Sequence, residues 1–269
     1  MNTADKFLAR LANDNAVVIS VASTQGSVPR EQGTWMAVFA SDAVGTIGGG
    51  NLEYQAMAEA RARLRGLPGA SGEALLCYPL GPSLGQCCGG VVHLRFECVT
   101  AADIAALKTR LSARLQPVAL FGGGHVGSAL AQVLALLPFS VTWIDSRDSI
   151  FPDTVPSSIL CEYSDPVQAA VNDLAPGACV LIMSFSHAQD LDIVAACLKR
   201  QREKSDLPYI GLIGSKTKWA TFRHRLEARG FTEEELARIT CPIGVSGITG
   251  KEPEVIAVAV AAQLLQARN

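Results

Sequence analysis

Two adjacent cysteines stand out among the residues whose chemistry could serve a function. Cys87 and Cys88 lie in the run Gly-Gln-Cys-Cys-Gly-Gly, between Gln86 and Gly89. A thiolate beside backbone N–H groups can have a lowered pKa, which makes it a soft metal ligand or a nucleophile. Neighbouring side chains in an extended segment point to opposite sides, so one of the two would face a ligand. The alternative is a buried cysteine pair beside a glycine turn, since a vicinal disulfide would be strained.

A glycine motif comes further along the chain, where an apolar strand is expected to turn into a helix. Gly122, Gly124 and Gly127 satisfy the pattern Gly-x-Gly-x-x-Gly, and His125 opens the helix. Such glycines permit a tight turn and a close approach of the backbone to phosphate. Asp145 closes the next strand, 18 residues beyond Gly127, where an acid can accept hydrogen bonds from a ribose. The motif predicts a Rossmann-like fold, with either a nucleotide site or a ligand-free packing turn.

Two more segments follow strands at the same edge of the expected sheet. His187 lies in Ser-Phe-Ser-His-Ala-Gln-Asp, residues 184–190, while Ser215 and Lys216 end a second glycine turn, Gly211–Lys216. Ligands of open α/β sheets bind at the carboxyl ends of the strands, so these side chains are candidate contacts to a phosphate or cofactor. A histidine there could also donate a proton or bind a metal. The alternatives are a hydrogen-bonded loop histidine and a solvated lysine beside a capped helix.

The N-terminal part carries a glycine-rich turn and an arginine. Gly48, Gly49 and Gly50 precede an expected helix, and Arg30 follows an apolar strand in the run Gly-Ser-Val-Pro-Arg. Three consecutive glycines can expose several N–H groups as a nest for anionic oxygen, and an arginine can add a bidentate contact to phosphate. From these residues alone, a sharp chain reversal beside an ordinary surface arginine is the simpler interpretation.

The elements that must position these residues fall into two groups. The first hundred residues contain β-type runs separated by glycines and one clear helix, for which Asn51 offers an N-cap. The expected strands are Ala16–Ser23, Thr34–Ala40, Ala74–Tyr78 and Val91–Val99, and the expected helices are Leu52–Arg65 and about Ala102–Leu115. Because Pro117 resists continuing a helix, we interpret Gln116-Pro117 as a connector and predict an α+β domain over residues 1–115.

Strands and helices alternate over the second group, residues 116–269. The expected strands are Val118–Phe121, Ser140–Ile144, Cys179–Met183 and Pro208–Ile213, and the expected helices are His125–Leu137, Leu191–Arg202, Lys216–Arg229 and Glu254–Ala267. Continuous apolar strands that alternate with helices imply a parallel sheet covered on both faces. The sequence thus predicts an α/β chain whose second domain is Rossmann-like. The last helix is apolar almost all round and should be buried, against the other domain or in a homodimer.

Composition excludes several classes of partner. The 269 residues are 49% hydrophobic and 18% charged, with a formal net charge of −2 and no long run of Lys or Arg. Nucleic acids and anionic membranes draw on clustered positive charge, so neither is expected as the main partner. The longest apolar stretch, Val255–Leu265, is shorter than the about 20 residues that a membrane span needs. No signal-peptide pattern opens the chain, so we expect a cytoplasmic protein.

The eight cysteines contain no Cys-x-x-Cys pair, which disfavours zinc-ribbon and thioredoxin-type sites. Cys179 and Cys197 lie in apolar runs and are predicted to be small core residues. Cys77, Cys98 and Cys161 fit ordinary positions on strands or at their ends.

Taken together, these motifs resemble the XdhC/CoxI family of xanthine dehydrogenase accessory proteins. The matching segments run through nearly the whole chain and are GSVPREQGTWMAV, GTIGGGNLE, LGQCCGGVVHLRFE, LFGGGHVGSALA, SHAQDLD, IGLIGSKTKWATFRHRLEARGF and CPIGVSGITGKEPEVIAVAVAAQLL. The resemblance implies a chaperone rather than an enzyme. Such a protein binds the molybdopterin form of the molybdenum cofactor and protects it. It then inserts the cofactor into xanthine dehydrogenase or a related molybdenum hydroxylase, after a cysteine desulfurase has supplied the sulfido ligand.

The resemblance also changes the ranking of the candidate sites. It implies that Cys87 or Cys88 approaches the molybdenum or takes part in its sulfuration, which makes the cysteine pair the leading site. Arg30 and Gly48–Gly50 become candidate contacts to the pterin phosphate, because N–H nests and basic side chains suit anionic oxygens.

The alternative function is an NAD(P)-dependent oxidoreductase. In that hypothesis the Gly122–Gly127 loop binds the dinucleotide, Asp145 selects NAD, and His187 is the acid–base residue. A regulatory nucleotide sensor without chemistry is a third hypothesis. The resemblance does not fix the ligand of the glycine loop. Relatives often carry two histidines near the fourth Rossmann strand, whereas this chain has Phe185 and His187, which weakens a metal-binding proposal at that edge.

Overall fold

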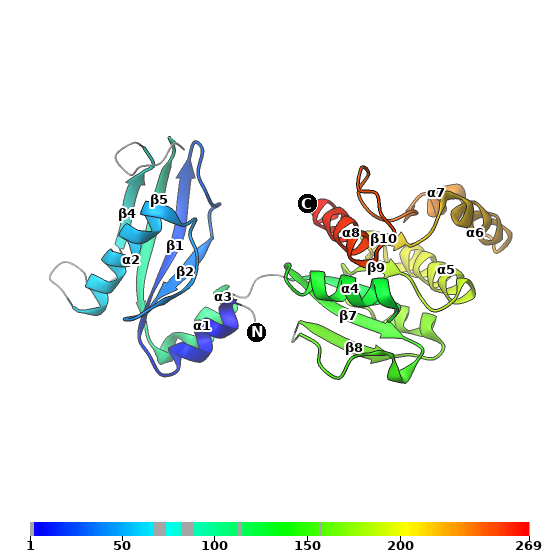
Figure 1. The fold of residues 1–269 in the computed structure, drawn as a ribbon, viewed down its shortest axis with the longest axis horizontal. Coiled ribbons are helices and arrows are strands. Elements are labelled where there is room, and N and C mark those ends of the chain that lie inside the picture. The colour runs from blue at the N-terminus through cyan, green and yellow to red at the C-terminus, as the bar shows by residue number, and fades with distance from the viewer. Residues whose placement is uncertain (1–2, 67–73, 82–88, 112–114, 157, 269) are drawn as a thin grey trace. The chain divides into compact units, whose positions relative to one another are not determined.

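The structure is a computed structural model that describes residues 3–66, 74–81, 89–111, 115–156 and 158–268. The chain divides into two compact units, Met1–Ser112 and Ala113–Asn269 (Figure 1). An antiparallel sheet organises the first unit and a parallel sheet the second. The predicted α/β fold class is therefore confirmed.

The N-terminal unit is built on one sheet of five strands in the order β3-β2-β1-β5-β4. The strands are β1 (Ala16–Gln25), β2 (Trp35–Val38), β3 (Ala43–Gly45), β4 (Ala74–Pro79) and β5 (Val91–Val99). The four predicted strands are confirmed. The short strand β3 and the nine-residue helix α1 (Thr3–Leu11) were not predicted, because neither is long enough to show a clear period.

Alternating side chains bury both faces of this sheet. Val17 and Ile19 of β1 pack with α2 (Gly50–Leu64), which covers one face. Val18, between them in the sequence, packs on the opposite face with α1 and α3 (Ile104–Leu111). A 3₁₀ turn, Ala101–Asp103, precedes α3, so the predicted second helix begins about two residues later as an α-helix. Residues 112–114 lie outside the described part of the chain.

The second unit has a six-stranded sheet in the order β11-β10-β9-β6-β7-β8, parallel throughout. Its strands are β6 (Gln116–Phe121), β7 (Phe139–Asp145), β8 (Ile159–Tyr163), β9 (Cys179–Ile182), β10 (Tyr209–Leu212) and β11 (Ile239–Thr240). This is the strand order of a Rossmann fold. The order reverses between β6 and β9, where Rossmann folds form their ligand crevice.

Helices cover both faces of the parallel sheet (Figure 1). On one face α4 (His125–Leu134) lies beside α8 (Pro253–Ala267). The other face carries α5 (His187–Lys204), α6 (Lys216–Ala228), α7 (Glu233–Leu236) and the 3₁₀ helix Val167–Asp173. The predicted burial of α8 is only partial: one side packs within its own unit, against α4 and the sheet, whereas Val258 and Leu265 are 52% and 38% exposed. In the described part of the chain, no helix has both the length and the apolar character that a membrane crossing requires.

Candidate functional site

Packing requires two of the three motif glycines after β6. Gly122 has a φ of +119°, and a Cβ there would lie 2.0 Å from the carbonyl oxygen of Met183. A Cβ at Gly127, in the first turn of α4, would lie 2.0 Å from the carbonyl oxygen of Gly122. The Trp143 indole donates to that same oxygen at 2.9 Å. Gly124, the N-cap of α4, has open space around it among the described residues, so it is the motif glycine that a ligand could approach.

The Asp145 carboxylate, which we predicted to bind a ribose, binds its own chain in this structure. Its side chain is 2% exposed. It accepts the N–H of Gly123 at 2.6 Å, and it accepts the backbone N–H, Nε and Nη2 of Arg147 at 2.9 Å each. A ribose could reach this carboxylate only by displacing Arg147. The observed role of Asp145 is thus to hold the glycine loop in place.

Side chains that follow β7 contact side chains that follow β9 across the carboxyl end of β6. The Arg147 guanidinium, after β7, lies 4.6 Å from the ring centroid of Phe185, after β9. Gln189 in α5 donates to the Ser146 hydroxyl at 2.8 Å. Because β7 and β9 flank β6 on opposite sides, these contacts cross the crevice in which Rossmann folds hold a dinucleotide.

Acid should weaken the Asp145 contacts. Burial alone would raise the pKa of Asp145, but its hydrogen bonds from Arg147 and Gly123 outweigh burial and hold the pKa below its usual value. The carboxylate therefore stabilises the fold at pH values above the unfolded-state pKa of about 3.9, and this stabilisation fades as the pH falls through the lower, folded-state value. We expect Asp145→Asn to cost about 2 kcal/mol at pH 7. Urea unfolding should show this difference shrinking towards pH 3; a difference independent of pH would contradict the assignment.

His187 and Ser215 meet at one pocket, whereas Lys216 lies outside it. His187 opens α5, with its ring edge-on to Phe222 at a centroid distance of 6.3 Å. Ser215 caps α6 by accepting the N–H of Lys218 at 3.1 Å. Both residues line a pocket of about 320 Å³ together with Lys218, while Lys216 is exposed. Sequence reasoning missed Lys218, although its place three residues after the N-cap puts it on the same side of the helix.

Two loops predicted as sites, and the first described residue after the cysteine pair, lie together at one end of the N-terminal sheet. Pro29 packs so closely on Gly48 that a Cβ there would lie 2.8 Å from the proline ring, and the Arg30 Cγ would lie 3.6 Å away. Gly89 forms an isolated bridge with Ser27, just before that proline. The structure therefore brings together Arg30, the triple-glycine turn and Gly89, which follows the cysteine pair in the sequence.

The cysteine pair and Gln86 lie outside the described residues. A hydrogen bond connects the described residues on the two sides of this segment. The N–H of Leu80 donates to the carbonyl of Gly90 at 2.7 Å. Gly89 directly follows Cys88 in the sequence. The two ends of the segment are thus fixed beside the loops that carry Arg30 and Gly48.

The triple-glycine turn already holds a carboxylate. Glu53 in α2 accepts the N–H groups of Ile47 and Gly49 at 3.1 and 3.0 Å, and the Thr46 hydroxyl at 2.6 Å. The N–H of Gly48 donates to the Thr46 hydroxyl oxygen at 3.2 Å. This turn therefore binds an anionic group, but the group belongs to the chain itself. A phosphate from outside would compete with Glu53 for these donors.

The described cysteines occupy structural positions. Cys179 and Cys197 are core residues, as predicted, and burial raises their pKa values to about 11 and about 12. Cys77 and Cys98 are exposed on β4 and β5. Within the described ranges, no three His, Cys, Asp or Glu side chains gather as they would around a metal ion.

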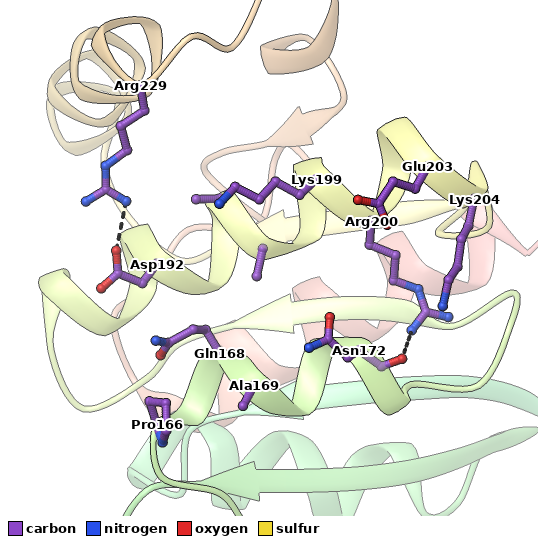
Figure 2. Close-up of a pocket in the computed structure, with 12 residues that line it drawn as sticks. Pro166, Gln168, Ala169, Asn172, Asp192, Lys199, Arg200, Glu203, Lys204 and Arg229 are labelled. Carbon is purple, nitrogen blue, oxygen red and sulfur yellow. Dashed lines mark hydrogen bonds and ion pairs between the residues drawn. The ribbon is translucent and has the colours of Figure 1, made fainter.

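A larger pocket, of about 580 Å³, lies between α5 and the 3₁₀ helix Val167–Asp173 (Figure 2). Arg200 lines it, yet all five N–H donors of its guanidinium have partners within the chain. These partners are the Asp206 carboxylate, bound twice, and the carbonyl oxygens of Val171, Asn172 and Leu174. Arg229, at the other end, pairs with Asp192 at 2.8 Å. The two arginines thus tie the walls of this pocket together, which leaves the smaller pocket at His187 as the better candidate for a ligand.

Comparison with known proteins agrees with both units. The family model described as the XdhC Rossmann domain matches residues 118–264, and the model described as the XdhC and CoxI family matches residues 9–79. The chain is 27% identical over 266 residues to the uncharacterized protein YqeB of Escherichia coli strain K12. That alignment covers 97% of this chain and 45% of YqeB, so the chain spans less than half the length of this relative.

A solved structure has the same fold. The crystal structure of a protein described as a xanthine dehydrogenase from Bacillus halodurans superposes with a TM-score of 0.82 and 19% identity, covering 100% of this chain and 96% of that one. Identity this low establishes the fold alone. The Rossmann-domain model by itself, however, covers more than half of the sequence. The chain belongs to the XdhC and CoxI family.

Proposed function

We propose that the protein binds the molybdenum cofactor and delivers it to xanthine dehydrogenase or a related molybdenum hydroxylase. Family membership supports a role in the maturation of xanthine dehydrogenase. In this proposal the protein is an accessory factor that holds and transfers its cargo without turning over a substrate. A cysteine desulfurase supplies the sulfido ligand while the cofactor is bound, and the protein acts as a homodimer in the cytoplasm.

The placement of the cofactor rests on Arg30, the triple-glycine turn and Gly89, which lie together in the N-terminal unit. Cys87 or Cys88 contacts the molybdenum, because a thiolate is a soft ligand and can also take part in sulfuration. Gln86 and Gly89 flank the pair and complete this contact. Arg30 is exposed and packs against the triple-glycine turn, so its guanidinium is available for a bidentate contact to the pterin phosphate.

The triple-glycine turn contributes less than the sequence suggests. Gly48 and Gly49 donate to Thr46 and Glu53, so a phosphate would reach their N–H groups only after Glu53 has moved. Gly50 begins α2 with a φ of +64°. We assign the main phosphate contact to Arg30, with the glycines shaping the turn against which it packs.

The alternative of an NAD(P)-dependent oxidoreductase has less support. It needs Asp145 for a ribose, and that carboxylate is engaged by Arg147 and Gly123. It also needs an open crevice at the end of β6, where Phe185 and Arg147 are in contact. We therefore assign the glycine loop a role in shaping the Rossmann unit.

Loss of the cysteine pair should abolish retention of the cofactor. The full chain is mixed with isolated molybdenum cofactor, separated by gel filtration, and assayed for molybdenum content and for reactivation of apo-xanthine dehydrogenase. Loss of the thiolates in Cys87→Ala plus Cys88→Ala should lower retention at least about tenfold, as expected when a metal contact is removed. Cys77→Ala plus Cys98→Ala removes two exposed thiols from strands and should have no effect. Equal retention by both double variants would sink the cysteine mechanism, and no retention by the unmodified protein would sink the chaperone function.

A further inference from the structure

The pocket at the N-terminal ends of α5 and α6 has a basic, hydroxyl-rich lining. Its basic side chains are His187, Lys218 and Arg225, and its hydroxyl groups belong to Ser215, Thr217 and Thr221. None of the described residues that line it is acidic. Positive charge and hydroxyl donors together suit an anion with several acceptor oxygens.

Lys218 is the most constrained of these basic side chains. Its Nζ donates to the Asp190 carboxylate at 2.6 Å and to the carbonyl oxygen of Ile213 at 2.8 Å. A lysine ammonium has three donors, so one remains for a ligand. The stem of the side chain folds across the turn after β10, where a Cβ on Gly214 would lie 2.6 Å from the Lys218 Cδ. Gly214 therefore gives the lysine room to reach the carboxyl end of the sheet.

Asp190 stands behind the lysine and does not line the pocket. Its side chain is 3% exposed, against 11% for Lys218. Its other oxygen accepts the N–H and hydroxyl of Ser184 at 2.8 and 2.6 Å. The carboxylate thus fixes the ammonium from the buried side, while the side that faces the pocket keeps its positive character.

Phe222 lies behind these side chains and is almost fully buried, at 2% exposure. The Phe222 ring lies beneath the Lys218 ammonium at 5.3 Å and edge-on to His187. At the rim, Arg225 forms no ion pair with any of the described residues. A ligand with an anionic head would match these features, with the head at Lys218 and Arg225.

We propose that this pocket binds the phosphate group of a small phosphorylated molecule, such as a nucleotide or a phosphorylated pterin. Lys218 and Arg225 bind the phosphate, the Ser215 hydroxyl donates to it, and Asp190 positions Lys218. The site belongs entirely to the Rossmann unit and is formed at β9 and β10, not by the glycine loop after β6. A nucleotide at this site would go beyond the proposed function, whereas a phosphorylated pterin there rests on it; neither depends on the cysteine pair.

Calorimetry on the full chain tests this site with inorganic phosphate, AMP, adenosine and a phosphorylated pterin. We expect inorganic phosphate, AMP and the phosphorylated pterin to bind, and adenosine to bind at least about tenfold more weakly than AMP, since a hydrogen bond to a charged group is typically worth a tenfold change or more. The tighter of AMP and the pterin identifies the source of the phosphate. Adenosine binding as tightly as AMP, or no binding of any phosphate compound, would overturn the proposal.

Variants locate the binding in this pocket. Arg225→Gln should weaken phosphate binding about tenfold, because it removes one charged donor from an exposed rim position that the fold does not need. Arg229→Gln, one turn further along and outside the pocket, is the matched control and should bind normally. Lys218→Met combined with Asp190→Asn removes both buried charges together, so it avoids an unpaired carboxylate and should fold without binding phosphate. Equal weakening by Arg225→Gln and Arg229→Gln, or normal binding by a folded double variant, would refute the site.

Discussion

Gly127→Ala should destabilise the Rossmann unit by about 3 kcal/mol, the cost of forcing a methyl group into a packed contact. The new Cβ would lie 2.0 Å from the carbonyl oxygen of Gly122, which is backbone and cannot rotate away. That oxygen also accepts the Trp143 indole N–H at 2.9 Å. Relief of the clash would therefore move the turn after β6, the start of α4 and a buried tryptophan together.

Gly124→Ala is the matched control for this prediction. It makes the same substitution three residues earlier, at an N-cap with open space around it and a φ of −71°. We expect a loss of about 1 kcal/mol, because alanine is a poorer N-cap than glycine but meets no clash at this position. Urea unfolding followed by circular dichroism measures both variants. If the two variants were equally stable, packing would not be the reason for a glycine at position 127. A nucleotide that bound the wild type but not Gly124→Ala would reopen the nucleotide hypothesis.

The Rossmann fold could be predicted because its signals are local. An apolar strand, the turn at Gly122–Gly127 and a helix follow one another within about twenty residues, and β7, β9 and β10 repeat the strand-and-helix alternation. The prediction of Asp145 at the end of β7 was right about its place. The use of its carboxylate could not be predicted in the same way. Whether that carboxylate faces a ribose or an arginine depends on the rotamer of Arg147 and on Phe185, which comes from a different strand.

The pocket at Lys218 was even harder to predict from the sequence than the role of Asp145. Ser215 could be found as a helix cap, and His187 as a residue beyond an apolar strand. Lys218 gains its role from Asp190, 28 residues earlier in the sequence, and from the space that Gly214 leaves for its stem. In the N-terminal unit, likewise, the sequence of the triple-glycine turn is typical of an open anion nest. In the structure, the Glu53 carboxylate already occupies that nest. Sequence patterns identify groups that can bind, whereas tertiary contacts decide which of them are already engaged.

Arg200→Met should cost about 3–4 kcal/mol, the range typical of breaking a buried ion pair from one side. The arginine side chain is 4% exposed, and it joins α5 to the Asp206 carboxylate and to three carbonyl oxygens near the end of the 3₁₀ helix Val167–Asp173. Methionine can fill much of the same volume, but it donates no hydrogen bond. Carbonyl oxygens and a carboxylate would then lose their donors in a place that water reaches poorly.

Arg229→Met tests whether burial rather than charge causes this loss. Arg229 lines the same pocket and forms an ion pair with Asp192 (Figure 2), at 2.8 Å against 2.7 Å for Arg200 and Asp206. Its side chain is 45% exposed and that of Asp192 is 42% exposed, so solvent screens the pair and the expected cost is below about 1 kcal/mol. Urea unfolding of both variants at pH 7 gives the comparison. If the two substitutions cost the same, the Arg200 contacts add nothing beyond a surface ion pair. The larger expected loss at Arg200 would instead establish that this pocket is a structural junction, which in turn favours the pocket at Lys218 as the place where the Rossmann unit binds a ligand.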